Sequence, residues 1–181
     1  RNLLVNFTEF KLNAQILSGV KELGYETATP IQEKAIPSIL AGLDVVGTAQ
    51  TGTGKTAAFA LPLLQRLMDG PRGQLRGLIL APTRELAEQI RQSIDRLAIR
   101  TGLRCTAIYG GANLVKQYQI LRRGVDIVIA CPGRLLDHIN RGNINLTQVE
   151  VLVLDEADHM FDLGFREPIY KIIRHLPKKR Q

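Results

Sequence analysis

A glycine-rich run ending in Gly-Lys-Thr is the stretch of this chain most able to do chemistry. Residues 49–56 follow a short apolar run at Val45-Val46 and precede an apolar, helix-like segment, Ala57 to Met68. Glycines let main-chain N–H groups turn toward a polyphosphate, and the N-terminus of the following helix adds its positive dipole end. The expected nucleotide-binding residues of this loop are Ala49, Gln50, Thr51, Gly52, Thr53, Gly54, Lys55 and Thr56.

Two residues of this loop are expected to have catalytic roles. The Lys55 amine is placed to contact β- and γ-phosphates, and the Thr56 hydroxyl is placed to contact a Mg²⁺ ion. Measured against the pattern G-x-x-x-x-G-K-[ST], Ala49 replaces the first glycine. The alternative is a flexible strand-to-helix loop without a ligand, which rarely ends in Gly-Lys-Thr by chance.

Two adjacent carboxylates, Asp155 and Glu156, directly follow an apolar run at residues 151–154. Such a pair is costly at the end of a buried strand unless a cation accompanies it, and a nucleotide-bound Mg²⁺ would supply one. Asp155 would hold the metal through water, and Glu156 would orient or deprotonate the attacking water. The alternative is a helix start with Asp158 as the N-cap, and the upstream phosphate loop argues against it.

Apolar runs without polar alternation predict the strands that position these residues. They lie at residues 77–81, 127–130 and 151–154, with a further predicted strand from Leu103 to Tyr109. Strands of this kind are buried on both faces, which indicates a parallel sheet covered by helices. Helices are predicted between and after them at residues 83–100, 113–123, 132–141 and 165–176.

The alternation of strands and helices predicts an α/β fold with an open, doubly wound, mostly parallel sheet. In such sheets ligands bind beyond the carboxyl ends of the strands. The phosphate loop, Pro82-Thr83, Cys131-Pro132 and Asp155-Glu156 all follow predicted strands directly. We therefore expect them at one edge of the sheet.

Two helices are predicted ahead of the phosphate loop. The first runs from Asn13, a suitable cap, to Leu23, and Gly24 suits the position after its end. The second begins at Thr29-Pro30, with proline at the first helical position, and ends near Gly42.

Composition limits the class of protein. The 181 residues suit one domain, and 45% hydrophobic with 23% charged residues is typical of a folded globular chain. The net charge of +7 favours a polyanionic partner, nucleic acid first and an anionic membrane surface second. No apolar run approaches the ~20 residues of a membrane span. Cys105 and Cys131 are predicted to be buried free thiols in a reducing compartment.

The motifs together resemble the DEAD-box RNA helicases, a family named after the tetrapeptide Asp-Glu-Ala-Asp that stands at residues 155–158. The phosphate loop has the form used by that family, so Ala49 is no departure. Further matches follow the family's order and cover nearly the whole chain: Gly24-Tyr25 with Thr29-Pro30-Ile31-Gln32 (the Q motif), Pro82–Leu86 (motif Ia), Gly110-Gly111 (the glycine doublet) and Pro132-Gly133-Arg134 (motif Ib).

The resemblance implies a RecA-like P-loop NTPase that binds ATP and Mg²⁺. Gln32 would read adenine through a bidentate amide contact, supported by Thr29 and Tyr25. Thr29-x-x-Gln32 is also a capping box, in which Gln32 bonds back to the helix start, and both roles can hold together. Phe7 is equally compatible with packing near the base and with ordinary core packing.

The resemblance also implies contacts to an RNA backbone at loops that follow the strands. Exposed N–H groups at helix starts bind phosphates without reading bases, which predicts sequence-independent, salt-sensitive binding. The residues concerned are Thr83, Arg84, Gly110, Gly111, Pro132, Gly133 and Arg134. Asp158 would couple the two helicase domains through the family's motif III. For Arg84 and Arg134 singly, a solvated surface arginine is the alternative.

Two departures from the family's pattern stand out. Cys131 replaces the usual Thr before Pro132, and cysteine caps a helix poorly, which predicts a helix start weaker by ~1 kcal/mol. Ala28 replaces the usual Pro of the Q motif. Motif III is expected soon after Gln181, together with a second, C-terminal RecA-like domain that carries arginine fingers.

The expected organisation is therefore a single N-terminal RecA-like domain over residues 1–181, with a helical region at 1–42 and the sheet core at 43–181. The expected function is ATP-dependent RNA unwinding by a cytoplasmic helicase, with this piece monomeric and nearly inactive alone. A nucleotide-dependent module that docks RNA or protein without catalysis is the main alternative. A small nucleotide kinase is disfavoured because no lid or acceptor-site pattern is found.

Overall fold

The computed structural model describes residues 5–50 and 52–181, which form two compact units. The first unit comprises the chain up to Gly70, residues 93–103 and Gln181, and the second comprises residues 71–92 and 104–180. Among the described residues, no helix combines the length and apolar character needed to cross a membrane.

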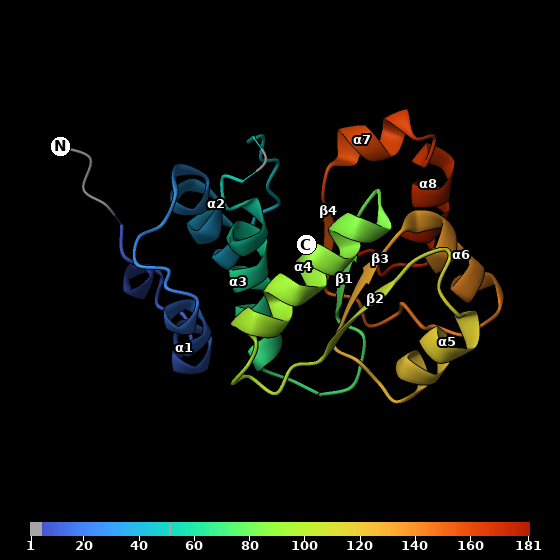
Figure 1. The fold of residues 1–181 in the computed structure, drawn as a ribbon, viewed down its shortest axis with the longest axis horizontal. Coiled ribbons are helices and arrows are strands. Elements are labelled where there is room, and N and C mark those ends of the chain that lie inside the picture. The colour runs from blue at the N-terminus through green and yellow to red at the C-terminus, as the bar shows by residue number, and fades with distance from the viewer. Residues whose placement is uncertain (1–4, 51) are drawn as a thin grey trace. The chain divides into compact units, whose positions relative to one another are not determined.

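Helices build the first unit, and their bounds follow from local capping. Asn13 caps α1 by accepting a hydrogen bond from the Gln15 N–H at 2.9 Å, as predicted. Pro30 begins α2, and Gly42 follows its end with a φ of 81°. The elements are a 3-10 helix, η1 (Phe7–Phe10), and the α-helices α1 (Ala14–Glu22), α2 (Pro30–Leu40) and α3 (Lys55–Met68) (Figure 1).

The core of this unit is aliphatic. Ile16 of α1, Ile36 of α2 and Leu61 of α3 are fully buried, and α2 packs against α3. These three residues mark the inward faces of their helices. The 3-10 helix was not predicted, and Asn6 forms a capping box at its start with Glu9.

The strand expected at Val45-Val46 is not formed, which corrects the prediction. Residues 43–50 carry no regular structure, and Val46 is 98% exposed. A strand is stable only where a neighbour satisfies its main-chain groups, and two apolar residues between Asp44 and Gly47 bury too little surface to secure that pairing.

A four-stranded parallel sheet forms the second unit, with the strand order β2-β3-β1-β4. The strands are β1 (Gly77–Leu80), β2 (Cys105–Ile108), β3 (Ile127–Ala130) and β4 (Val151–Leu154). The strands predicted at residues 77–81, 103–109, 127–130 and 151–154 are confirmed, although β2 is shorter than the predicted stretch. The sheet and its helices confirm the α/β class (Figure 1).

Helices follow each strand of this unit. They are α4 (Arg84–Leu97), α5 (Leu114–Arg122), α6 (Pro132–Asn140), α7 (Ala157–Asp162) and α8 (Arg166–Arg174), and the last residues of α4 belong to the first unit. The helix α7 was considered only as an alternative at the sequence level, with Asp158 as its cap. The structure places Glu156 at that cap position instead.

Both faces of the two central strands are buried. Leu78, Val128 and Ala130 join one core with Leu135 of α6 and Ile172 of α8. The alternate residues Ile79, Ile127 and Ile129 are also fully buried on the other face. This is why the strand sequences show uninterrupted apolar runs.

A buried carboxylate fixes the starts of two strands. Asp126 is fully buried before β3 and accepts hydrogen bonds from the main-chain N–H groups of Gly73, at 2.7 Å, and Arg104, at 2.8 Å. Because these bonds satisfy the carboxylate oxygens, the charge can be accommodated in the interior. The loops at this end of the sheet are held in register, opposite the end that carries the candidate site.

Candidate nucleotide and nucleic-acid sites

The phosphate loop lies in the first unit and folds back on itself. Gly52 and Gly54 take the left-handed conformation, with φ values of 83° and 89°. The Lys55 amine donates to the Ala49 carbonyl at 2.7 Å, and the Thr53 hydroxyl donates to the Gln50 carbonyl at 2.7 Å. These two bonds tie Thr53 and Lys55 back to the residues at the start of the loop.

One predicted residue of this loop, Thr51, lies outside the described residues. The helix α3 begins directly after the loop at Lys55, and its cap residue, Gly54, provides no side-chain hydrogen bond. Since the first N–H groups of a helix need acceptors, this start suits an anion. The half-buried Thr56 lies in the same first turn, so its hydroxyl adds a hard oxygen ligand of the kind that Mg²⁺ prefers. The donor set therefore fits a magnesium polyphosphate.

Thr29 and Gln32 bind the phosphate loop from α2. The Thr29 hydroxyl donates to the Thr53 carbonyl at 2.8 Å, and the Gln32 amide nitrogen donates to the Gly54 carbonyl at 3.0 Å. The Gln32 amide oxygen accepts from the Thr29 N–H at 2.9 Å, which is the predicted capping-box contact. The structure thus brings the start of α2 together with the loop, a contact that sequence spacing did not predict.

Tyr25 and Phe7 differ in exposure. Phe7 is 2% exposed, whereas Tyr25 is 43% exposed, and their rings stack with centroids 6.1 Å apart. Phe10 adds an edge contact to Phe7, with centroids 5.9 Å apart. Phe7 is therefore a core residue that supports the exposed Tyr25 ring, in accord with the core-packing alternative.

The acidic pair lies in the second unit, at the carboxyl end of β4. The Asp155 N–H extends the sheet by donating to the Leu80 carbonyl at 3.0 Å. Glu156 adopts the left-handed conformation, with φ 52° and ψ 52°, and its carboxylate lies 3.2 Å from Nδ1 of His159. Left-handed backbone is unfavourable for a glutamate, and such conformations cluster at functional sites. Asp158 is exposed on the first turn of α7.

Thr83 and Arg84 follow β1. The Thr83 hydroxyl caps α4 by accepting from the Leu86 N–H at 3.2 Å. The exposed Arg84 guanidinium lies over the ring of Tyr109, 5.9 Å from its centroid, and 3.4 Å from Glu85. A depression of about 380 Å³ opens between this face of α4 and Tyr109. Tyr109, the residue that follows β2, thus holds the Arg84 guanidinium at the surface with its ring.

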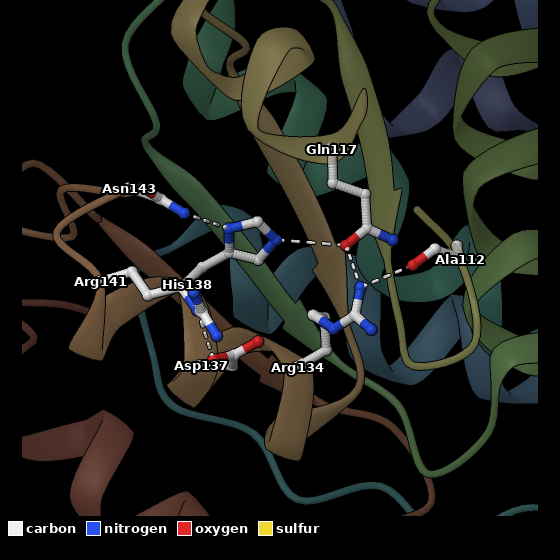
Figure 2. A network of polar contacts seen from close by, with 7 residues as sticks. All are labelled: Ala112, Gln117, Arg134, Asp137, His138, Arg141 and Asn143. Atoms are coloured by element: carbon white, nitrogen blue, oxygen red, sulfur yellow. Dashed lines mark hydrogen bonds and ion pairs between the residues drawn. The ribbon is translucent and has the colours of Figure 1, made fainter. Parts of the chain in front are cut away.

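The glycine doublet and the start of α6 are brought together. Gly110 and Gly111 are exposed, and Gly111 has a φ of 80°. Next to them, Arg134 of α6 donates from Nη1 to the Ala112 carbonyl at 3.0 Å (Figure 2). Pro132 is buried, and Gly133 is exposed in the first turn of α6. Arg134 is therefore tied to the doublet's loop and is not a freely solvated arginine.

The carboxyl ends of all four parallel strands carry predicted site residues. Thr83 follows β1, Gly110 follows β2, Pro132 follows β3 and Asp155 follows β4. Because the strands are parallel, these positions lie along one edge of the sheet. The strand order puts Pro132 between Gly110 and Thr83, with Asp155 on the far side of Thr83.

Cys131 caps α6 without a side-chain hydrogen bond, as the departure from threonine predicted. Both cysteines are free and half-buried, so the expectation of full burial is corrected. Burial raises the pKa of the Cys131 thiol to about 11, and the negative charge of Glu85 acts in the same direction. The thiol is therefore protonated at neutral pH.

A buried polar network behind Arg134 was not predicted. Gln117 of α5 is 6% exposed and His138 of α6 is fully buried. Burial lowers the pKa of His138, and the charge of Arg134 lowers it further. At the surface, a hydrogen bond from Arg141 lowers the pKa of Asp137. The sequence feature that could have indicated this network is the i, i+4 spacing of Arg134 and His138, which places both side chains on one side of α6.

Comparison with known proteins gives consistent matches. A protein-family model described as "DEAD/DEAH box helicase" matches residues 29–181. The chain is 46% identical over 178 residues to the ATP-dependent RNA helicase CshA of Listeria monocytogenes, which covers 98% of this chain and 34% of that protein. It is 48% identical over 176 residues to the ATP-dependent rRNA helicase rrp3 of Emericella nidulans, with 97% and 38% covered. The chain thus spans about a third of the length of these relatives.

Proposed function

Because the chain belongs to the DEAD/DEAH box helicase family, we propose that it is the ATP-binding, RecA-like first domain of an ATP-dependent RNA helicase. In this proposal residues 1–181 form one domain, with the Q-motif helices at 1–42 and the sheet core at 43–181. A second RecA-like domain completes the ATP and RNA sites in the intact protein, which we place in the cytoplasm. The piece itself is a monomer.

The observation that carries the nucleotide part is the pair of hydrogen bonds made by the Gln32 side chain, one to the phosphate loop and one to the start of α2. Gln32 uses one amide hydrogen for the Gly54 carbonyl and one lone pair for the Thr29 N–H. An amide has two hydrogens and two lone pairs, so one of each remains for the N7 and N6 groups of adenine. The exposed Tyr25 lies on the same unit and offers an apolar ring to the base. Base recognition and loop geometry would then depend on the same side chain.

Phosphate binding depends on the loop and the start of α3. The β- and γ-phosphates would be bound by the loop N–H groups, the helix N-terminus and the Lys55 amine. Lys55 would exchange its bond to the Ala49 carbonyl for one to a phosphate oxygen. Thr56 and Asp155 would hold Mg²⁺, which neutralises charge on the phosphates when bound. Glu156 would accept a proton from the water whose oxygen attacks the γ-phosphorus, while the bond to ADP breaks.

RNA binding depends on the loops beyond β1, β2 and β3. Main-chain groups at Thr83, Gly110, Gly111, Pro132 and Gly133, together with Arg84 and Arg134, would contact phosphates and sugars. Such contacts carry no base information, so affinity should fall with salt and vary little with sequence. In the intact helicase, closure of two domains on ATP and RNA would bend one strand and so release its partner. Asp158 would couple this closure to hydrolysis.

The test is ATP turnover with and without RNA, measured on this piece and on a chain extended through a second domain. We expect RNA-stimulated turnover from the extended chain and almost none from the piece. Glu156→Gln in the extended chain should retain ATP binding and lose turnover. RNA-stimulated turnover by the piece alone would contradict the proposed need for two domains.

A second candidate is a nucleotide-dependent module that docks RNA or protein without catalysis. It is the candidate for the piece alone, because the chain covers only 34% and 38% of the two relatives that are named as helicases. Nucleotide and RNA binding without turnover in the extended chain would select this candidate.

A further inference from the structure

The side-chain amide of Gln117 contacts three residues in two parts of the second unit, the segment after β2 and the helix α6. Its nitrogen donates to the Tyr109 carbonyl at 3.1 Å. Its oxygen accepts from Nη1 of Arg134 at 3.0 Å and lies 3.2 Å from Nε2 of His138 (Figure 2). An amide oxygen has two lone pairs, so both are used when His138 carries its proton on Nε2.

The hydrogen bonds of His138 and Asn143 fix the orientation of the Gln117 amide. With Nε2 of His138 protonated, Nδ1 is an acceptor, and the Asn143 side-chain nitrogen lies 3.3 Å from it. His138 is fully buried, so both of its ring nitrogens need such partners. A chain of hydrogen bonds therefore runs from Asn143 through His138 and Gln117 to Arg134 (Figure 2).

The same chain of bonds holds the loop of the glycine doublet at both ends. Gln117 binds the Tyr109 carbonyl just before Gly110, and Arg134 binds the Ala112 carbonyl just after Gly111. A Cβ atom added at either glycine would meet no atom of the described residues within 4 Å, its chain neighbours left aside. Hydrogen bonds therefore hold the loop on both sides of two glycines whose Cβ side is open.

The network also selects which edge of the Arg134 guanidinium is available. Nη1 makes both internal bonds, to Ala112 and to Gln117. Within residues 5–50 and 52–181, Nε and Nη2 have no protein acceptor. Those two groups form the parallel pair of donors that binds a phosphate bidentately.

We propose that Gln117 is a positioning residue for RNA: it holds Nη1 of Arg134 and the Tyr109 carbonyl so that the Nε–Nη2 edge and the Gly110-Gly111 N–H groups face one stretch of phosphate backbone. His138 and Asn143 orient Gln117 in turn. This rests on the proposed function, in which Arg134 and the glycine doublet contact RNA. Apolar side chains could fill the space between α5 and α6 without needing any hydrogen-bond partners. A buried polar network, in which every group must find a partner, therefore fits a positioning role better than a purely structural one.

The experiment is a double-mutant cycle of Gln117→Met and Arg134→Ala, read out by the binding of this chain to a labelled single-stranded RNA over a range of salt. Met has a similar length and good helix propensity but cannot make the three bonds. Gln119→Met is the matched control, since Gln119 is exposed on the same helix. We expect Gln117→Met to lower RNA affinity about fivefold and Arg134→Ala to reduce the salt slope by about 1.

In the Arg134→Ala background, Gln117→Met should change RNA affinity by less than about twofold, because positioning acts through Arg134. An equal loss in both backgrounds, or no loss from Gln117→Met alone, would overturn the inference. An unchanged affinity and salt slope for Arg134→Ala would instead overturn the proposed RNA contact, and the inference with it. If Gln117→Met does not fold, His138→Phe removes the donor to Gln117 and should show the same dependence on Arg134.

Discussion

The amide nitrogen of Gln32 donates to the main-chain carbonyl of Gly54 at 3.0 Å, although the two residues lie 22 positions apart. The contact is so close that a Cβ atom on Gly54 would lie 2.4 Å from that nitrogen. Gly54 also has a φ of 89°, which only glycine adopts readily. The geometry of the phosphate loop is therefore tied to the start of α2.

Gly54→Ala should weaken ATP binding at least about tenfold, because the loop must move away from Gln32 and adopt a less favourable backbone. Titration with a fluorescent ATP analogue measures this loss. Gly47→Ala is the control, since among the described residues beyond its chain neighbours a Cβ atom there would meet Ile31 alone, at an ordinary 3.5 Å. Unchanged affinity in Gly54→Ala would show that this loop does not bind the nucleotide.

Gln32→Glu should weaken ATP binding and reduce the preference for ATP over GTP. A carboxylate still accepts from the Thr29 N–H, but it places an oxygen against the Gly54 carbonyl and offers no hydrogen to adenine N7. A bidentate amide–adenine pair contributes about 1–3 kcal/mol of discrimination. Competition between ATP and GTP measures it. Equal losses for both nucleotides would mean that Gln32 supports the loop without reading the base.

The sequence predicted those features that depend on local spacing. Asn13 and Thr29 were identified as helix starts because capping is decided within one turn, and the apolar strands were identified because both faces are buried. The bonds of Gln32 to Gly54 and of Gln117 to His138 join residues 22 and 21 positions apart, so only packing of the elements shows them. The left-handed backbone of Glu156 had no sequence signal, since glutamate disfavours it.

Cys131→Thr should raise the free energy of unfolding by ~1 kcal/mol, because a threonine hydroxyl can accept from the first N–H groups of α6 where the thiol makes no such bond. Urea denaturation of the two chains compares them directly. Cys131→Ala is the control for loss of the thiol and should give no gain. A Thr variant no more stable than Ala would show that α6 needs no cap at this position.

His138 should make the folded chain less stable in mild acid. Burial lowers its pKa in the folded state below the ordinary value of 6.5, helped by Arg134 and Arg141 and opposed by Asp137. Around and below that value the unfolded chain binds more protons at this histidine than the folded chain, so the contribution of His138 to stability is constant well above pH 6.5 and is lost as the pH drops through and below it. Unfolding free energies from pH 8 to pH 5 should fall more steeply than in His138→Phe. Equal slopes would mean that the folded chain accommodates a charged His138.

The folded chain should be less stable with glutamate at position 156 than with a residue suited to left-handed backbone. Its φ of 52° costs roughly 1–2 kcal/mol for most L-residues, whereas asparagine tolerates this region. Glu156→Asn and Glu156→Gln both remove the carboxylate charge, but the longer glutamine can still accept a hydrogen bond from His159. The two variants are therefore compared in the His159→Ala background, where they differ mainly in this backbone preference. We expect the free energy of unfolding of the Asn variant to exceed that of the Gln variant by about 0.5–1 kcal/mol. Both variants should lose turnover in the extended chain. Equal stability of the two variants would show that Glu156 carries no strain, while turnover retained in either would show that the carboxylate does not accept the proton from water.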